Sequence, residues 1–338
     1  MKPAVSQGGE IVVSSRVRLA RNYHDLPFSN VDHPENAQLC IDRARQALEG
    51  ISPDDRYALY KLREMNKMDQ LSLMERHLIS RDLLQHSEVG AALVRDDQRI
   101  SVMVNEEDHL RIQAMLNGFA LLDAAMLAFK AEDRLAAVCD FSFDNQLGYL
   151  TACPTNTGTG MRASLMLHLP MLTRRKQMGN VSQTVAKLGL TIRGIYGEGS
   201  EALGDLYQVS NQVTLGRTEN EIIEAVMAVG QQLIDMESAL RVRGDKDSLD
   251  LEDGVWRSYG ALRFARQMES GEFMEHWSNL RLGAAMGILP VPLSIVDDLL
   301  TIAQDAHVKK FKHSDANLVS TDQARCVVIQ TKLEPKEV

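Results

Sequence analysis

The sequence predicts an α+β domain followed by a smaller all-α domain. Short β-rich runs alternate with segments of helical periodicity as far as about residue 216, whereas the chain after residue 248 carries helical patterns without a convincing strand. In addition, 338 residues exceed the length at which a single hydrophobic core usually stops growing. We therefore expect one domain over residues 1–248 and a second over residues 249–338.

The expected strands of the first domain are short runs rich in β-branched and aliphatic residues. They cover residues 11–19, 57–62, 99–104, 148–152, 190–195 and 207–215. Between them, apolar residues recur at helical spacing over 35–48, 70–79, 119–138 and 181–188. Thr218 followed by Glu221 forms a capping box, which predicts a long helix that runs to about Val242. The polar segment 243–248 then predicts a linker.

The composition excludes several classes of protein. The chain is 44% hydrophobic and 25% charged, and its net charge of −9 argues against general nucleic-acid binding. No segment approaches the ~20 uninterrupted apolar residues of a membrane helix, and the N-terminus lacks the apolar core of a secretion signal. The four cysteines form no C-x-x-C pair, which argues against a disulfide framework and a structural zinc site. We therefore expect a cytoplasmic protein without membrane partners.

Arginine is unusually frequent for an acidic chain, at 25 arginines against 12 lysines. Compositional bias explains such a count, but so does a need for planar, permanently charged donors that bind phosphate groups. The common phosphate-binding motifs are missing. The glycine-rich segment 194–199 lacks the Lys-Ser/Thr of a P-loop and does not match the dinucleotide-binding pattern, and no protein-kinase signature appears. Any phosphate site must therefore be built differently.

Four conspicuous motifs combine charged groups with the ends of expected strands. In the first, Ser14-Ser15-Arg16-Val17-Arg18, strand alternation places both arginines on one face, which suits a polyphosphate. The second, residues 105–111, concentrates three carboxylates before an arginine, although such runs are usually solvated turns. The third, residues 153–162, places a lone cysteine before a glycine-rich loop and an arginine, although a lone cysteine is usually a small buried hydrophobe. The fourth, residues 193–201, leads from an arginine into glycines and carboxylates.

In this order, the motifs S-S-R-V-R, N-E-E-D-H-x-R, C-P-T-N-x-G-T-G-x-R-A-S and R-G-I-Y-G-E-G-S-E-A resemble those of the phosphagen (guanidino) kinases. The bacterial protein arginine kinases are the favoured branch. Only ten residues precede the first strand, which leaves no room for the N-terminal helical domain of the small-molecule enzymes, and Tyr196 stands where those enzymes have another arginine. The resemblance implies an antiparallel sheet flanked by helices, followed by the small all-α domain, and ATP-dependent phosphorylation of arginine side chains in proteins.

The resemblance also implies which residues bind ATP. Five arginines match positions that clamp the phosphates, and His77 matches a histidine that lines the nucleotide site, although it is also interpretable as an ordinary surface histidine. Mg²⁺ is expected to be held by phosphates and water, without dedicated protein ligands. The arginines are Arg16, Arg18, Arg111, Arg162 and Arg193. The backbone expected to line the rest of the pocket comes from Ser14, Ser15, Val17, Ala163, Ser164, Leu165, Met166, Gly194, Ile195, Tyr196, Gly197 and Glu198.

The acceptor side of the reaction needs groups that orient a guanidinium, compensate its charge and take a proton. By the same resemblance, Glu107 and Glu198 are the flanking carboxylates, with Glu107 expected to be the general base. Cys153 matches a reactive cysteine, and nearby arginines are expected to favour its thiolate form.

The region after residue 250 resembles the domain that dimerises protein arginine kinases, so we expect a homodimer. The family has an R-D-x-x-R-A motif that binds phosphoarginine allosterically. Here Asp322 and Arg325 are retained, but Thr321 replaces the first arginine and Cys326 the alanine, which makes this regulation doubtful.

The resemblance also implies a stress-response role in protein quality control, in which proteins with exposed arginines are marked for an AAA+ unfoldase and protease, with an activating adaptor as a further expected partner. Two alternatives remain open: a kinase for free arginine or another small guanidino compound, and an inactive adaptor that binds nucleotide or phosphoarginine.

Overall fold

An eight-stranded sheet organises the first domain in the computed structural model, which describes residues 9–28, 34–49, 55–195, 202–242, 248–314 and 319–334. All neighbouring strands are antiparallel, in the order β2-β3-β4-β5-β1-β8-β10-β9. Two very short strands form a separate hairpin. The strands are β1 (Val12–Arg21), β2 (Tyr57–Lys61), β3 (Ala91–Arg95), β4 (Ile100–Val104), β5 (Leu110–Asn117), β6 (Phe143–Asp144), β7 (Gly148–Tyr149), β8 (Met161–His168), β9 (Leu190–Gly194) and β10 (Leu206–Asn211).

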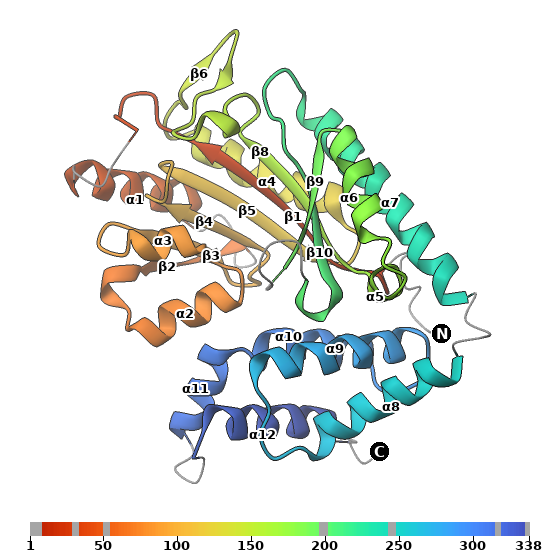
Figure 1. Ribbon diagram of the computed structural model, residues 1–338. Coiled ribbons are helices and arrows are strands. Elements are labelled where there is room, and N and C mark those ends of the chain that lie inside the picture. The colour runs from red at the N-terminus through yellow and green to blue at the C-terminus, as the bar shows by residue number, and fades with distance from the viewer. Residues whose placement is uncertain are drawn as a thin grey trace.

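Four helices cover one face of the sheet and enclose the main core (Figure 1). They are α1 (Pro34–Leu48), α4 (Leu121–Ala136), α6 (Met178–Lys187) and α7 (Glu219–Val242). Near the β2 edge, the opposite face carries a smaller core under two short helices, α2 (Lys67–Glu75) and α3 (Arg81–Gln85). The remaining short elements are α5 (Pro170–Arg174), η2 (Leu62–Glu64), η3 (Pro154–Asn156) and η4 (Leu203–Asp205).

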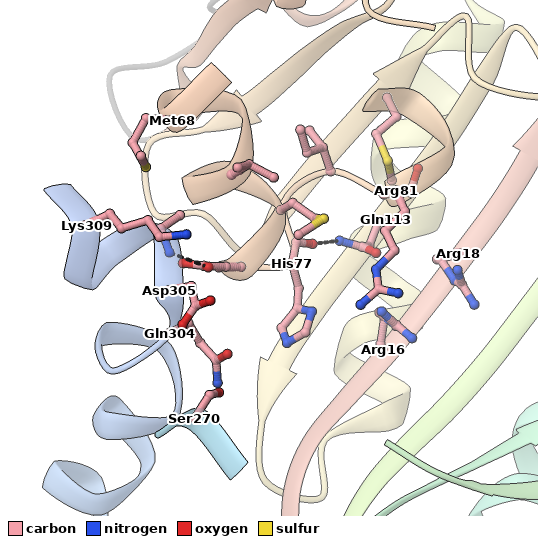
Figure 2. Close-up of a pocket in the computed structure, with 17 residues that line it drawn as sticks. Arg16, Arg18, Met68, His77, Arg81, Gln113, Ser270, Gln304, Asp305 and Lys309 are labelled. Carbon is pink, nitrogen blue, oxygen red and sulfur yellow. Dashed lines mark hydrogen bonds between the residues drawn. The ribbon is translucent and has the colours of Figure 1, made fainter. Parts of the chain in front are cut away.

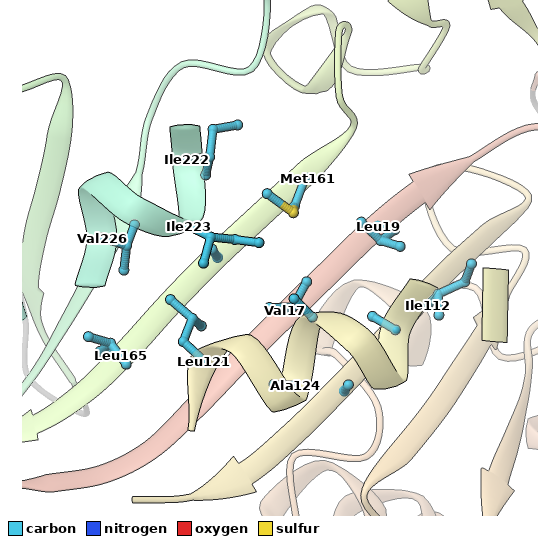
Figure 3. Close-up of a cluster of buried hydrophobic side chains, with 14 of the residues drawn as sticks. Val17, Leu19, Ile112, Leu121, Ala124, Met161, Leu165, Ile222, Ile223 and Val226 are labelled. Carbon is cyan, nitrogen blue, oxygen red and sulfur yellow. The ribbon is translucent and has the colours of Figure 1, made fainter. Parts of the chain in front are cut away.

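Alternation along β1 divides its residues between the core and the opposite face of the sheet. Val17 and Leu19 are completely buried, and Figure 3 shows them among aliphatic side chains from α4, β5 and β8. Each such side chain contributes about 1.5–3 kcal/mol through burial. Because successive side chains of a strand point to opposite faces, this core also determines where Arg16 and Arg18 point, namely away from it.

The long helix expected after Thr218 is present as α7, and its capping box is confirmed. Glu221 N–H donates to Thr218 Oγ1 at 3.2 Å, and Thr218 N–H donates to Glu221 Oε2 at 2.8 Å. The helix expected over 70–79 ends earlier, at Glu75, because the chain turns through a positive φ of 58° at His77. The strand expected over 148–152 is reduced to the two residues of β7. The expected linker at 243–248 lies almost entirely outside the described residues.

The described part of the chain from residue 248 onward contains helices and no strand, as expected. Their bounds are α8 (Ser248–Phe264), α9 (Ser270–Ala285), α10 (Leu293–Ile302), α11 (Asp305–Ser314) and α12 (Thr321–Leu333). This helical region packs against one end of the sheet, with Leu206 of β10 inside its core and Val13 and Met166 beside it (Figure 1). Among the described helices, none has both the length and the apolarity needed to cross a membrane.

Candidate active site

Five arginines from the strands β5, β1, β8 and β9 lie on the sheet face opposite the main core. Arg18 on β1 is paired directly with Arg162 on β8 and with Gln113 on β5, and Arg111 is two residues from Gln113 on the same strand. Across the β10 pairings, the same face continues to Arg193 on β9. Paired residues of an antiparallel sheet share a face, so the register brings the predicted arginines together.

Several like charges are crowded together and partly buried on this arginine face. Burial, and then the charges of Arg16, Arg111 and Arg162, hold the pKa of Arg18 well below its usual value. Burial followed by the charge of Arg193 lowers the pKa of Arg162. Arg16 donates to Gln208 Oε1 at 2.8 Å and Arg162 donates to Ser210 Oγ at 3.1 Å, but the buried Nε atoms of Arg18 and Arg162 have no acceptor among the described residues. Clustered cations with unused donors fit a polyanion.

The acidic motif after β4 is largely buried, which rules out the interpretation as a solvated turn. The Glu106 side chain is 0% exposed and forms a bidentate pair with Arg111, whose Nε and Nη1 lie 2.7 and 2.8 Å from its two oxygens. Ser80 Oγ also donates to Glu106. Burial raises the pKa of Glu106, whereas Arg111 acts in the opposite direction. Glu107 is different, because its side chain is 43% exposed and lies 3.6 Å from Arg111 Nη2. Glu107 is therefore accessible to an acceptor.

Asp108 connects the Glu107 loop to the Cys153 loop. Its Oδ1 accepts hydrogen bonds from Asn22 Nδ2 at 2.6 Å and from the backbone N–H of Ala152 at 2.7 Å. Because Asp108 follows Glu107 and Ala152 precedes Cys153 in the chain, this carboxylate places the two predicted catalytic residues on adjoining loops. The Cys153 sulfur is 3.1 Å from Thr155 Oγ1, and its preference for the thiolate form stays a prediction.

Two cavities flank His77 between the sheet and the helical region. The first, about 500 Å³, is lined by His77, Arg16 and Arg18 together with residues from α2 and α11 (Figure 2). The second, about 620 Å³, is lined by His77, Ser14 and Met166 together with residues of α10. Burial, and then the charge of Arg16, lowers the pKa of His77 to about 4, so this side chain is neutral near pH 7. Ser14, Arg16, Arg18, His77 and Met166, all predicted nucleotide residues, therefore each line at least one of these two cavities.

The remaining predicted nucleotide residues occupy several environments. The side chains of Val17, Ala163 and Leu165 lie in the main core, so only their backbone faces the site. Ser15 is buried, donating to Gly118 O at 2.8 Å and accepting from Ala120 N–H at 2.9 Å, and Ser164 Oγ lies 3.4 Å from Arg16 O. Gly194 ends β9, and Ile195 packs against the core of the helical region. Tyr196, Gly197 and Glu198 lie outside the described residues.

Sequence reasoning missed several residues that shape this site. Asn22, Gln113 and Asp108 are buried polar residues whose partners lie far away in the chain. Gln113 Nε2 donates to the backbone oxygen of His77 at 2.6 Å and so fixes the turn after α2. For Gln113, the available signal was its alternation with Arg111, which predicts a strand with both side chains on one face.

The degenerate motif in α12 is built into the helical core. Arg325 is 1% exposed and donates to the backbone oxygens of Ala303 and Met268 at 3.0 and 2.7 Å. It also donates to Asp322 Oδ1 at 2.7 Å and to Asp305. All three of its guanidinium nitrogens thus have protein acceptors, which fits a structural role better than a phosphoarginine site.

Comparisons with known proteins match both regions of the chain. Residues 40–240 match the ATP:guanido phosphotransferase C-terminal catalytic domain, and residues 248–337 match the protein-arginine kinase McsB C-terminal domain. The chain is 43% identical to the protein-arginine kinase of Caldanaerobacter subterraneus subsp. tengcongensis over 97% of its length and 98% of that protein. The corresponding enzyme of Desulforamulus reducens is also 43% identical, over 98% of this chain and 94% of that one.

Solved structures agree with this assignment. A lombricine kinase aligns with a TM-score of 0.62 at 26% identity, covering 71% of this chain and 70% of the other. A duplicated taurocyamine kinase from Schistosoma mansoni, solved with transition-state analogue components, aligns with a TM-score of 0.63 at 26% identity over 75% of this chain and 38% of the other. Together with the arginine face and the two-part sequence match, these similarities show that the chain belongs to the protein-arginine kinases of the ATP:guanido phosphotransferase family.

Proposed function

We propose that this protein transfers the γ-phosphoryl group of ATP to a guanidino nitrogen of arginine side chains in proteins. The observation that carries the proposal is the arginine face of the sheet, next to which an accessible carboxylate and a cysteine stand on loops joined by Asp108. In the reaction, a bond forms between the acceptor nitrogen and the γ-phosphorus, and the bond to the oxygen bridging the β- and γ-phosphates breaks. The proton from the acceptor goes to a carboxylate, and ADP leaves.

The arginines supply binding and charge stabilisation. The transition state of phosphoryl transfer spreads negative charge over the equatorial oxygens, which fixed guanidinium groups neutralise without reorganising. Arg18 and Arg162 are paired across neighbouring strands and have unused buried donors, so both are suited to this position. The bidentate contact with Glu106 holds Arg111 in place before any ligand binds.

Glu107 is our choice for the general base, and Cys153 for the group that sits against the acceptor guanidinium. An arginine side chain is protonated at neutral pH and is a poor nucleophile until a proton is removed. Glu107 is accessible, whereas Glu106 is committed to Arg111 and Ser80. Glu198, the second expected carboxylate, lies outside the described residues and keeps its proposed role from the sequence alone.

Mg²⁺ fits this site as an ion held by the nucleotide. Among the described residues, no three His, Cys, Asp or Glu side chains are grouped to enclose a metal ion. Glu106 is engaged by Arg111 and Ser80, and Asp108 by Asn22, whereas Glu107 lies 3.6 Å from Arg111 Nη2 but stays accessible. Mg²⁺ bound by phosphates and water would neutralise charge on the transferred group.

One assay distinguishes the candidate activities. The full-length protein is incubated with Mg-ATP and either an unfolded arginine-rich protein or free arginine, and acid-labile phosphate is measured on each acceptor. We expect label on the protein. Label on free arginine alone would favour the small-molecule kinase, and absence of label on both, with ATP still bound, would favour an inactive adaptor.

The cellular setting is proposed from family membership. We propose a cytoplasmic homodimer whose residues 249–338 form the dimerisation domain and whose residues 1–248 carry catalysis. We further propose that phosphorylation marks proteins for an AAA+ unfoldase and protease during stress, with an activating adaptor as a partner. Regulation by phosphoarginine is not proposed, because Arg325 is enclosed by protein acceptors and Thr321 offers no second guanidinium.

A further inference from the structure

A sixth arginine, Arg81, lines the same cavity as Arg16 and Arg18. It stands at the start of α3, on the segment that follows the His77 turn. In Figure 2 its guanidinium points toward that of Arg16 and away from the α3 backbone. None of the four motifs contains Arg81, and the strand alternation that groups the other arginines does not include it.

Arg81 makes no hydrogen bond or ion pair within the described ranges, although other arginines near the site have partners. Arg16 donates to Gln208, Arg111 is paired with Glu106, and Arg162 donates to Ser210. Arg18 presents a second, independent sign of a missing ligand, because its buried Nε has no acceptor in the described structure. Arg81 is exposed and lines the cavity, whereas the Nε of Arg18 is buried there without an acceptor, and together the two guanidinium groups suit an anion.

The backbone at Arg81 is connected by hydrogen bonds of its neighbour Ser80 to the Glu106–Arg111 pair. Ser80 caps α3 by accepting from Leu83 N–H at 3.0 Å, and the same hydroxyl donates to Glu106. Glu106 in turn holds Arg111. Arg81 therefore starts from a backbone anchored to the Arg111 pair, which reduces the entropy lost when its side chain binds a ligand.

The position of Arg16 indicates which phosphates Arg81 reaches. Arg111 is paired with Ala20, near the end of β1 that adjoins the Glu107 and Cys153 loops, so the γ-phosphate belongs at that end. Arg16 precedes Ala20 by four residues on β1, so the two backbone positions are roughly 13 Å apart at the rise of an extended strand. Arg81, which points toward Arg16, is consequently directed at the α- and β-phosphates rather than at the γ-phosphate.

We propose that Arg81 is a further phosphate-binding residue, which contacts the α- and β-phosphates of the nucleotide. The proposal rests on the proposed function in that it places ATP on the arginine face. Hydrogen bonds to charged groups are strong enough that loss of Arg81 weakens nucleotide binding by about 10- to 100-fold. Because the α- and β-phosphates are present in both nucleotides, ADP and ATP are weakened alike.

The test measures binding of ADP, and of ATP without an acceptor, by isothermal titration calorimetry on the full-length protein. Arg81→Ala is expected to raise both dissociation constants about 10- to 100-fold, and Arg81→Lys to recover part of the loss. The KM for ATP should rise in parallel, while kcat at saturating ATP stays within about threefold. Arg56→Ala is the matched control, since Arg56 is exposed and, among the described residues, forms its ion pair with Asp96 at the far edge of the sheet.

Each outcome decides the assignment. If Arg81→Ala binds ADP within twofold of the wild type, Arg81 is not a phosphate ligand. If ATP is weakened and ADP is not, the contact with the α- and β-phosphates is wrong. A wild-type protein that binds ADP but forms no phosphoarginine refutes the proposed function, and the effect of Arg81→Ala on ADP binding still tests this inference separately.

Discussion

Replacement of Asp108 by alanine should damage catalysis through the loops that carry Glu107 and Cys153, which this side chain connects. The side chain is 3% exposed, and its Oδ1 receives hydrogen bonds from Asn22 Nδ2 and from the backbone N–H of Ala152. Without it, Ala152 N–H loses its acceptor and the loops of Glu107 and Cys153 lose their connection. We therefore expect both lower stability and slower phosphoryl transfer.

The size of the effect follows from these two hydrogen bonds. A buried donor left without an acceptor costs about 1–3 kcal/mol, and a hydrogen bond to a charged group contributes about 1.5–3 kcal/mol. The Asn22 amide keeps its other bond, to Leu150 O at 3.2 Å, so its loss is partial. Asp108→Ala should thus reduce the free energy of unfolding by about 3 kcal/mol, equivalent to about 6–12 °C in Tm. Asp108→Asn, which retains an oxygen acceptor, should lose about 1 kcal/mol.

Thermal unfolding followed by circular dichroism, together with steady-state kinetics, checks this prediction. We expect kcat to fall at least about tenfold in Asp108→Ala, because displaced catalytic groups are costly, while ADP affinity stays within twofold. Asp133→Ala is the control, since Asp133 is an exposed carboxylate on α4 away from both loops. Wild-type Tm and kcat in Asp108→Ala would show that other contacts position Glu107 and Cys153.

The remaining predictions concern the catalytic groups, a partly buried histidine, the contact between the two regions and the degenerate motif. Glu107→Ala and Cys153→Ser should fold and bind ADP normally but lose activity by about 10²-fold or more, by analogy with loss of a single transition-state donor; full activity in either variant excludes its assigned role. The pKa of His77 is about 4 in the folded protein and about 6.5 in an unfolded chain. Between pH 6.5 and pH 4 the imidazole is therefore protonated in the unfolded state but not in the folded state, so the free energy of unfolding decreases as the pH falls through this range. The loss reaches up to about 3 kcal/mol, and His77→Asn should show correspondingly less change in urea midpoint between pH 7 and pH 4.5; an unchanged pH dependence contradicts the assignment. Glu75 on α2 caps α11, accepting hydrogen bonds from Ala306 N–H at 2.6 Å and His307 N–H at 3.0 Å. Glu75→Ala should therefore destabilise the contact between α2 and α11 by about 1–2 kcal/mol and speed amide hydrogen exchange in α11. Unaltered exchange would show that other residues hold α11 against the first domain. Arg325→Met removes the donor from the backbone oxygens of Ala303 and Met268 and should destabilise the helical region by about 2–4 kcal/mol in urea unfolding; a change below about 1 kcal/mol would mean that Arg325 is not a structural residue.

The Arg16–Arg18 part of the arginine face was predictable because it depends on local alternation. Arg16 and Arg18 are two residues apart in a strand whose intervening residue, Val17, is apolar, so the sequence already indicates that they share a face. Thr218 and Glu221 were likewise predictable, since a capping box is complete within four residues.

Three strands of the sheet were not predicted, for two different reasons. The buried run of β3 is only five residues long, and such a run cannot be distinguished from a piece of buried helix by periodicity. In β5 and β8, Arg111 and Arg162 alternate with core residues, but the motifs that contain them indicated loops with functional groups more strongly than strands. The early end of α2 carried no signal either, because the residue with positive φ is His77 rather than glycine or asparagine.

The residues that position the catalytic groups could not be predicted from any local sequence pattern. Asp108 is 86 residues from Asn22 and 44 from Ala152, and Ser80 is 26 residues from Glu106. Such pairs form only when the sheet register brings distant loops together, and no spacing rule within one motif encodes them. Arg81 belongs to the same class, since α3 and not a β-strand directs it into the cavity.

The arginines of β1 serve two separate purposes, which the structure distinguishes by the acceptors of each side chain. Arg21 follows Arg18 by three residues on β1 and so points to the other face, where its Nε is 2.6 Å from Glu132, its Nη1 donates to Thr159 O at 2.9 Å, and its guanidinium stacks 3.5 Å from the Tyr149 ring centre. A lysine there would lose both the fork and the stacking, so this arginine is required for structure. Arg18 has no acceptor for its buried Nε in the described residues, so its fork is held ready for a ligand. Within one strand, the side on which an arginine points thus decides whether its charge is satisfied by the fold or by the substrate.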